Sequence, residues 1–298
     1  MDVNYLDEKL LLKLSQIPLK PISLADGIYK GYHHSIKAGG EIDFREFRKY
    51  VQGDDLKKID WKLSARQDKF FIKEFEEDLN YKVHFILDQS ASMGQKASHE
   101  ISKIEYAKFI LSALSYLFLK QGDQVQVSTF SKSFIHLLDS TANIKQISYL
   151  NKELNKVTSI GISDFSLLIG KTQTARNEKQ IIFIFSDFIY NLDGLINVFK
   201  KINSPKTRII LFQLINKDEI YFDFKGETSF IDPESGETIV CNSGQIKDNF
   251  ISRWKNFQEE LKHWSDTLSI EYRVFNTSIH YSDNLLDFIK SYHVSQTR

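Results

Sequence analysis

The sequence predicts an α/β fold in which a mostly parallel central sheet is covered by helices on both faces. From residue 81 onward, short apolar segments alternate with amphipathic segments, which is the pattern of strand–helix–strand units. The segment 180–185, QIIFIF, is apolar throughout, as is typical of a strand buried on both faces of a parallel sheet. The chain has 298 residues, 42% hydrophobic and 26% charged, which is the composition of a globular protein large enough for such a core.

Each strand and helix follows from a local pattern. Residues 82–87, KVHFIL, form a β-rich run that ends at Asp88. Residues 101–121 carry apolar side chains at three-to-four spacing, and Gly122 is a suitable residue to end that helix. The remaining strands are expected at 124–130, 134–138, 180–185, 208–214 and 270–275. The remaining helices are expected at 143–154, 164–174, 192–202, 249–268 and 284–292.

Two regions of the chain differ in composition. Residues 1–80 are rich in charges and have few long apolar runs, so we expect an irregular and helical N-terminal segment that packs on the main domain. Residues 81–298 are expected to form the α/β domain. Glycines and a proline near 219–243 indicate turns, so a β-rich insert is expected there.

Composition excludes several classes of function. The 39 Lys and Arg residues balance the 39 Asp and Glu residues, which disfavours a general electrostatic attraction to nucleic acid. The apolar runs are far shorter than the roughly 20 residues that span a bilayer, and the N-terminus has no signal-peptide pattern. We therefore expect a cytoplasmic protein without an integral membrane segment, and peripheral membrane association stays open. The single cysteine, Cys241, excludes an intramolecular disulfide and a cysteine-based zinc site.

Acidic and hydroxyl side chains follow two of the expected strands. Asp88, Ser90 and Ser92 stand at alternate positions after the first strand, Asp187 follows a later one, and Ser163 lies in a separate loop. Ligands of parallel sheets bind at the carboxyl ends of the strands, so these oxygens are expected to converge. Such a hard-oxygen set suits Mg²⁺, or alternatively Mn²⁺, better than Zn²⁺. Because these oxygens are too few to complete an octahedron, we expect water and a carboxylate from a partner to join them.

The D-x-S-x-S pattern of residues 88–92, with a later hydroxyl and aspartate, resembles the metal-ion-dependent adhesion site of von Willebrand factor A domains. That family usually has Thr where this chain has Ser163. A run upstream is similar to the signature of the family called domain of unknown function 58. The run consists of YVQGDD at 50–55, IDW at 59–61, AR at 65–66 and IKEF at 72–75. Two departures are Lys58, where Arg is more common, and the lack of the transmembrane segments that many members carry before this region.

The resemblance implies a von Willebrand factor A-like, Rossmann-type domain. We expect the strand order 3-2-1-4-5-6, with the strand at 134–138 antiparallel at one edge. It also implies the metal ligands Asp88, Ser90, Ser92, Ser163 and Asp187, and a partner that supplies an acidic side chain. Family members resemble proteins that act beside MoxR-type AAA+ ATPases. The expected function is therefore a non-enzymatic, metal-dependent protein-binding adaptor in chaperone-like assembly or remodelling.

Two other functions stay open. Asp88 after an apolar strand is also typical of aspartyl-phosphate phosphatases, so it would be the nucleophile of a metal-dependent phosphohydrolase. Those enzymes usually have a second aspartate where this chain has Ser90. The second alternative is a structural scaffold with an inactive metal site, in which the cluster only caps exposed backbone N–H groups.

The role of the segment 48–66 also has two possible interpretations. Its charges balance, so we expect an ion-pair network that docks the segment on the α/β domain, and a partner-binding surface is the alternative. We expect Asp60 and Trp61 to begin a helix with a buried aromatic side chain. The charged residues of this network are Arg48, Asp55, Asp60 and Arg66.

Overall fold

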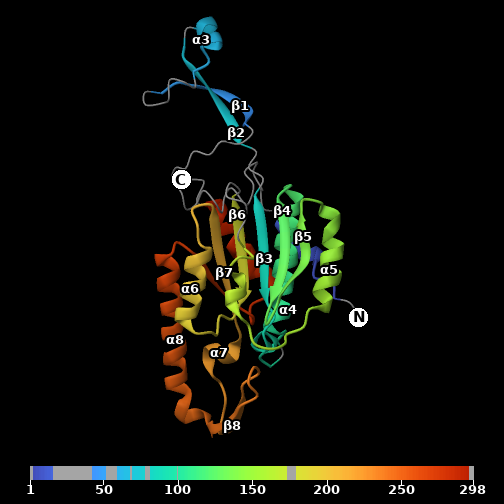
Figure 1. Cartoon of the computed structure of the whole chain (residues 1–298), viewed down its shortest axis with the longest axis vertical. Helices are drawn as coiled ribbons and strands as arrows, with labels where there is room; N and C mark the ends of the chain where they lie inside the picture. Colours follow the sequence, from blue (N-terminus) through green and yellow to red (C-terminus); the bar gives the residue numbers. More distant parts are fainter. Residues whose placement is uncertain are drawn as a thin grey trace. The chain divides into compact units, whose positions relative to one another are not determined.

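A computed structural model describes residues 3–15, 42–51, 59–67, 69–77, 81–98, 100–172 and 179–294 (Figure 1). The chain divides into two compact units. One joins Met1–Tyr32 with Tyr81–Arg298, and the other is His33–Asn80. Helix α1 (Glu8–Ser15) belongs to the larger unit, and just before it the Tyr5 hydroxyl donates to Glu105 Oε2 at 2.7 Å. How the two units pack on one another stays a prediction.

The larger unit is built on a six-stranded sheet with the order β10-β7-β6-β3-β4-β5. Every neighbouring pair is parallel except β4 and β5, which are antiparallel at one edge. Numbered along the chain, these six strands have the order 3-2-1-4-5-6, so the expected order and antiparallel edge are confirmed. The strands are β3 (Lys82–Asp88), β4 (Gln124–Phe130), β5 (Phe134–Thr141), β6 (Gln180–Ser186), β7 (Thr207–Ile215) and β10 (Glu271–Asn276).

Helices cover both faces of this sheet (Figure 1). On one face, Ile184 and Leu211 of the strands pack in a buried cluster with side chains of α6 and α8. On the other face, Phe183 contacts Phe118 of α4 and Phe288 of α9 through their rings. The helices are α4 (Lys103–Lys120), α5 (Ile147–Lys156), α6 (Leu192–Ile202), α7 (Lys217–Tyr221), α8 (Ser243–Thr267) and α9 (Tyr281–Val294).

The strongest local patterns are confirmed. All residues of β6 are buried, as a strand covered on both faces requires. Helix α4 begins after Ser102, whose side chain accepts from Glu105 N, and it ends before Gly122, whose φ of 88° suits glycine. No helix in the described ranges is long and apolar enough to cross a membrane.

Two expected helices differ from the structure. The helix expected at 164–174 is only a 3₁₀ turn, η4 (Phe165–Leu168), within the described part of that range. Gly170 follows with a φ of 81°, a left-handed conformation that interrupts a right-handed helix. Helix α8 begins at Ser243, earlier than the expected residue 249, because the Asn242 side chain caps it by accepting from Gly244 N.

The smaller unit has an antiparallel pair that the sequence analysis missed. Strand β1 (Ile42–Lys49) pairs with β2 (Phe71–Glu77), so the description of this region as only helical and irregular is wrong. A bulge between Phe44 and Glu46 interrupts the pairing, which breaks the period-two pattern by which a strand is recognised.

Helix α3 (Trp61–Gln67) begins where expected. Asp60 Oδ1 accepts from the backbone N–H groups of Lys62 and Leu63 at 3.0 Å, which caps the helix. Trp61 is 61% exposed, so the expected buried aromatic side chain is wrong. Its first-turn position on a short helix leaves the ring only a partial contact, edge to face with Phe70. The expected network of this segment includes Asp55 and the Arg48 side chain, which lie outside the described part.

The region near 219–243 contains a hairpin of β8 (Glu227–Ile231) and β9 (Thr238–Asn242). Its two strands form a sheet separate from the central one. In Figure 1 this hairpin and helix α7 lie at the lower end, where the carboxyl ends of the central strands also lie. The insert is therefore placed at the edge of the sheet where ligands of parallel sheets bind.

Candidate metal site

The structure brings the five expected ligands together at the carboxyl ends of two central strands. Strands β3 and β6 pair in parallel, which places Asp88 beside the segment that contains Asp187. Ser90 directly precedes η2 (Ala91–Gly94), Ser92 lies within it, and Ser163 lies just before η4. All five side chains belong to buried residues.

The Asp88 carboxylate links three segments of the chain. Its Oδ1 accepts from Ser90 N at 2.8 Å and from the Ser163 hydroxyl. Its Oδ2 accepts from the Ser186 hydroxyl at 2.6 Å. The hydroxyl oxygens of Ser90 and Ser92 are 3.0 Å apart. Asp88 is thus the hub of the cluster, and it holds the loop of Ser163 against the ends of β3 and β6.

Backbone hydrogen bonds fix the two loops that carry the serines. Gln89 N donates to Phe130 O at 3.0 Å, and Ile160 N donates to Gln89 O at 2.6 Å. Ala91 N donates to Gly161 O at 2.8 Å, where Gly161 has a φ of 74° that favours glycine. The bonds to Gln89 O and Gly161 O tie the loop after β3 to the loop before η4, and the bond to Phe130 O ties it to the end of β4. The hydroxyl groups are therefore positioned by the backbone as well as by Asp88.

Burial and neighbouring charges both act on the Asp88 carboxylate. Burial, and after it the nearby Asp187 carboxylate, raise the pKa of Asp88 to about 6. Hydrogen bonds from Ser163, Ser186 and Ser90 to the carboxylate act in the opposite direction. Two buried carboxylates side by side repel each other, and a cation between them relieves both the burial cost and the repulsion.

A buried ammonium group already balances part of this charge. Lys103, at the start of α4, is fully buried, and its Nζ lies 2.8 Å from Asp187 Oδ2 and 2.7 Å from Glu219 Oε1. Burial alone would lower the pKa of Lys103, but the charges and hydrogen bonds of Asp187 and Glu219 outweigh it and raise that pKa. The lysine is therefore charged. Glu219 is itself fixed by a capping box with Asn216 at the start of α7.

Four residues of this neighbourhood were missed from the sequence. Ser186 directly precedes Asp187, and its position at a strand end was a usable signal. Lys103 stands in the apolar stripe of a helix, where a lysine looks like the edge of a solvated face. Glu219 and Glu234 come from the insert, and no local pattern relates either of them to Asp88.

The donor set fits the expected ion. The group consists of two carboxylates and hydroxyl oxygens, which is the chemistry of Mg²⁺ or Mn²⁺ rather than of Zn²⁺. Among the described residues, no group of three or more His, Cys, Asp or Glu side chains has a metal-binding arrangement. A site here would consequently depend on its serine hydroxyls. Lys103 Nζ donates to Asp187 Oδ2. Asp187 Oδ1 accepts a longer hydrogen bond from Ile189 N, at 3.2 Å.

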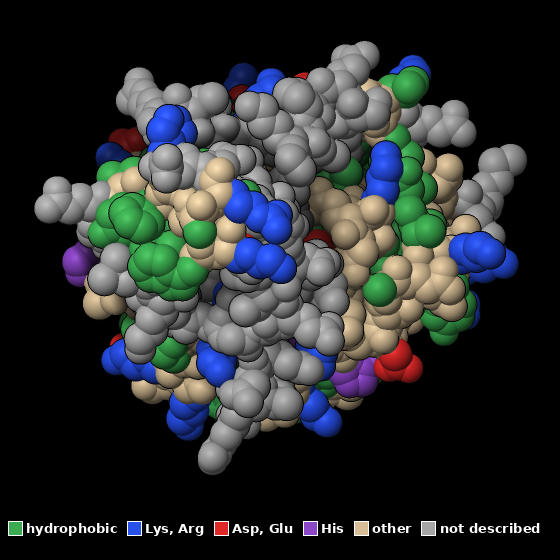
Figure 2. Space-filling model, turned by 90° about the horizontal axis from the view of Figure 1, so that it is seen from above, with side chains coloured by type: hydrophobic (Ala, Val, Ile, Leu, Met, Phe, Trp, Pro, Cys, Tyr) green, Lys and Arg blue, Asp and Glu red, His purple; other side chains and the backbone are tan. Residues whose placement is uncertain are grey.

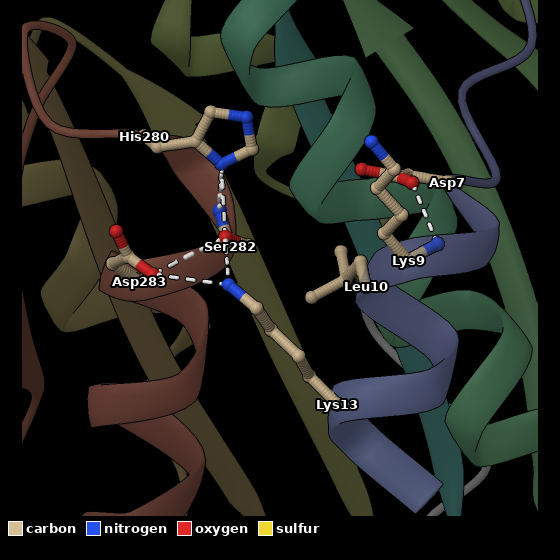
Figure 3. A pocket seen from close by; sticks show the side chains of 7 residues that line it. All are labelled: Asp7, Lys9, Leu10, Lys13, His280, Ser282 and Asp283. Carbon is tan, nitrogen blue, oxygen red and sulfur yellow. Dashed lines mark hydrogen bonds and ion pairs between the residues drawn. The ribbon is translucent and has the colours of Figure 1, made fainter.

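A separate pocket of about 490 Å³ lies between α1 and the start of α9 (Figure 3). Three of its charged side chains have partners. Lys13 Nζ lies 3.6 Å from Asp283 Oδ1, and the Tyr281 hydroxyl donates to Asp7 Oδ2 at 2.8 Å. None of the five expected metal ligands is among the residues that line it. The pocket therefore does not belong to the strand-end cluster.

The solved structures to which this chain is similar include three of low sequence identity. BatB, a conserved hypothetical protein of Bacteroides thetaiotaomicron, is 14% identical with a TM-score of 0.44, over 72% of this chain and 98% of that one. An aerotolerance-related membrane protein of Bacteroides fragilis is 17% identical with a TM-score of 0.43, over 71% and 99%. The VWA domain of SpRpn10 is 14% identical with a TM-score of 0.41, over 70% and 95%. These values carry no argument about function, and the fold assignment depends on the strand order described above.

Sequence comparison identifies relatives of equally open function. The uncharacterized proteins Mb1516 of Mycobacterium bovis and Rv1480 of Mycobacterium tuberculosis are each 29% identical over 87 residues. That alignment spans 29% of this chain and only 27% of either relative. A family model described as "Protein of unknown function DUF58" matches residues 46–260, which is most of the chain. The expected membership is thus confirmed, and this chain belongs to the DUF58 family.

Proposed function

We propose that this protein is a non-enzymatic adaptor whose strand-end cluster holds Mg²⁺, or alternatively Mn²⁺, and binds an acidic side chain of a partner protein. The ion supplies an electron-pair acceptor for a carboxylate oxygen of that partner. The observation that carries the proposal is the convergence of carboxylates and hydroxyls from three chain segments on one buried point. The residues that would hold the ion are Asp88, Ser90, Ser92, Ser163 and Asp187.

Specificity in this proposal comes from the site rather than from a general surface charge. The formal net charge of the chain is zero. On the face drawn in Figure 2, the described Lys and Arg side chains are dispersed among hydrophobic and uncharged polar ones. A partner would therefore be selected by its acidic side chain and by the shape of the surface around the cluster.

The finer part of the proposal names the partner class. The resemblance of segment 50–75 to the DUF58 signature supports a MoxR-type AAA+ ATPase as the partner, with a cytoplasmic role in chaperone-like assembly or remodelling. This part depends on family resemblance alone. Copurification of the two proteins in the presence of Mg²⁺, and its loss in the Asp88→Ala variant, would test it.

The geometry gives less support to a phosphohydrolase. A nucleophilic aspartate needs a free carboxylate oxygen near the substrate. Here both oxygens of Asp88 accept hydrogen bonds from serine hydroxyls, and the residue is 1% exposed. Ser90 stands where those enzymes usually have the second aspartate that acts as an acid. No described contact supplies a substitute for that acid.

Isothermal titration of Mg²⁺ into the full chain tests the proposed site. The wild type should bind one ion per chain, and Asp88→Ala should abolish binding. Ser92→Ala keeps the hub intact and should weaken binding at least about tenfold. Asp164→Asn is a matched control, because this neighbouring carboxylate only caps Ser166 N. Circular dichroism must show that each variant is folded, and absence of binding by the wild type would contradict the proposed site.

A further inference from the structure

The turn of the β8–β9 hairpin is held rigid by its own hydrogen bonds. Asp232 Oδ1 accepts from Glu234 N at 2.9 Å, and its Oδ2 accepts from the Ser235 hydroxyl at 2.7 Å. Gly236 N donates to Asp232 O at 2.8 Å, with a Gly236 φ of 76°. These bonds fix the backbone on both sides of Glu234. The direction of its side chain is therefore set by the turn rather than by chance.

The Glu234 side chain lies beside the strand-end cluster. Within residues 231–240 it is the one residue that is not exposed. Its carboxylate lies beside the Ser92 hydroxyl, close enough to interact electrostatically with Asp187 and Lys103. Ser92 is itself a buried residue of the cluster. The chain's own insert thus brings a carboxylate to the place where the proposed function needs one from a partner.

The base of the hairpin has a separate attachment. The ring of Phe222 lies 5.4 Å from that of Phe230 and 4.5 Å from that of Phe250 of α8. Ser243 N and its hydroxyl both donate to Gly226 O at 2.9 Å. Between base and tip the strands are exposed to solvent. The large apolar side chains there are Ile231, Ile239 and Val240, at 63%, 65% and 60% exposure.

The tip of the hairpin approaches the cluster through the Glu234 side chain. A two-stranded hairpin is marginally stable alone in water. The aromatic base holds one end, and the approach of Glu234 to Ser92 holds the other. In the absence of a cation, that approach is opposed by repulsion, because Asp88, Asp187 and Glu219 are carboxylates and only Lys103 is positive. A cation in the cluster would convert the repulsion into attraction.

We propose that Glu234 is an internal carboxylate ligand of the strand-end cluster, which takes the position of the partner's acidic side chain until a partner displaces the hairpin tip. This inference rests on the proposed function and adds a regulatory step to it. A tethered ligand has an effective concentration on the order of millimolar. A partner with a single acidic side chain would not compete with it. The partner must therefore gain further contacts, for which the exposed sides of the hairpin are available.

Two variants of the full chain separate Glu234 from its surroundings. Glu234→Gln removes the charge at nearly constant size. Glu237→Gln, in the same turn, is the matched control, because Glu237 is exposed. Calorimetry measures Mg²⁺ affinity, and hydrogen exchange of the backbone amides of 227–242 measures closure of the hairpin with and without Mg²⁺.

Mg²⁺ should bind Glu234→Gln about tenfold to hundredfold more weakly than wild type, the loss typical of a group that supports a metal site. Glu237→Gln should match the wild type. Mg²⁺ should slow exchange in the hairpin of the wild type and of Glu237→Gln, but not of Glu234→Gln. If wild type binds Mg²⁺, Asp88→Ala does not, and Glu234→Gln matches wild type in both measurements, this inference alone is overturned. If wild type binds no Mg²⁺, the proposed function fails and the inference fails with it.

Discussion

Replacing Lys103 with methionine tests whether a built-in cation balances the cluster. The substitution keeps the apolar stem and removes the charge. Lys103 Nζ lies 2.8 Å from Asp187 and 2.7 Å from Glu219, and a contact of this length is worth about 6 kcal/mol at an effective dielectric constant of about 20. The cost of burying the ions offsets much of that. Removing one partner of a buried ion pair typically costs about 3–5 kcal/mol, so we expect the free energy of unfolding without metal to fall by that amount.

The same substitution should increase the response to Mg²⁺. Asp187 and Glu219 lose their countercharge, so the cluster becomes more negative and attracts a divalent cation more strongly. A ligand that binds only the native state stabilises it in proportion to the logarithm of its concentration over its dissociation constant. A tenfold gain in Mg²⁺ affinity would therefore restore about 1.4 kcal/mol at saturation. Part of the lost stability should return when Mg²⁺ is added.

Urea unfolding with and without saturating Mg²⁺ measures both effects. Lys108→Met is the matched control, because Lys108 is equally buried on the same helix. Its Nζ contacts Glu105 Oε1 at 2.6 Å and Val157 O at 2.7 Å, away from the cluster. The control should lose stability but gain no more from Mg²⁺ than wild type does. The reasoning is refuted if Lys103→Met is as stable as wild type, or if its Mg²⁺ response equals that of Lys108→Met.

Two further variants test the packing around the sheet. Burial and the nearby His136 lower the pKa of His84 to about 3, against about 6.5 unfolded, so the unfolded chain binds more protons between these values. Stability should fall by about 1.6 kcal/mol from pH 6.5 to pH 5, and unfolding of His84→Leu should lack this component. Gly94→Ala would place a methyl against the Ser159 side chain, and should cost about 1–3 kcal/mol and weaken Mg²⁺ binding. Adding Ser159→Ala to this variant should restore part of the lost stability and part of the Mg²⁺ affinity. An unaltered melting temperature of the single variant Gly94→Ala would count against this close contact.

The central sheet was predictable because its signals are local. Strands at 82–87 and 180–185 are continuous apolar runs, and the stripe of α4 has the period of a helix with caps at both ends. The order of the strands came from family resemblance rather than from these runs. The pair β1 and β2 was missed because a bulge breaks the alternation that would reveal it. Local periodicity thus indicates elements well where one face is uniformly buried, and poorly where pairing is irregular.

The convergence of the five expected ligands was predictable because each follows a strand or precedes a turn in the chain. The charge balance of the cluster could not be predicted from the sequence, because it depends on residues that are distant along the chain. Lys103 is separated from Asp187 by 84 residues and from Glu219 by 116, and neither distance follows from a local pattern.

The charges of these residues decide how the cluster would behave. Asp88, Asp187, Glu219 and Glu234 carry four negative charges against the single positive charge of Lys103, which leaves three negative charges when all are ionised. Such an excess in a buried setting is unfavourable until protons or a cation reduce it. A bound divalent cation would reduce the net charge of these groups to one negative charge. Closure of the hairpin and occupation of the cluster are therefore coupled, because the approach of Glu234 is opposed without the cation and favoured with it. A partner that displaces Glu234 would have to bring a carboxylate of its own, since withdrawal of Glu234 alone would leave the ion without that carboxylate.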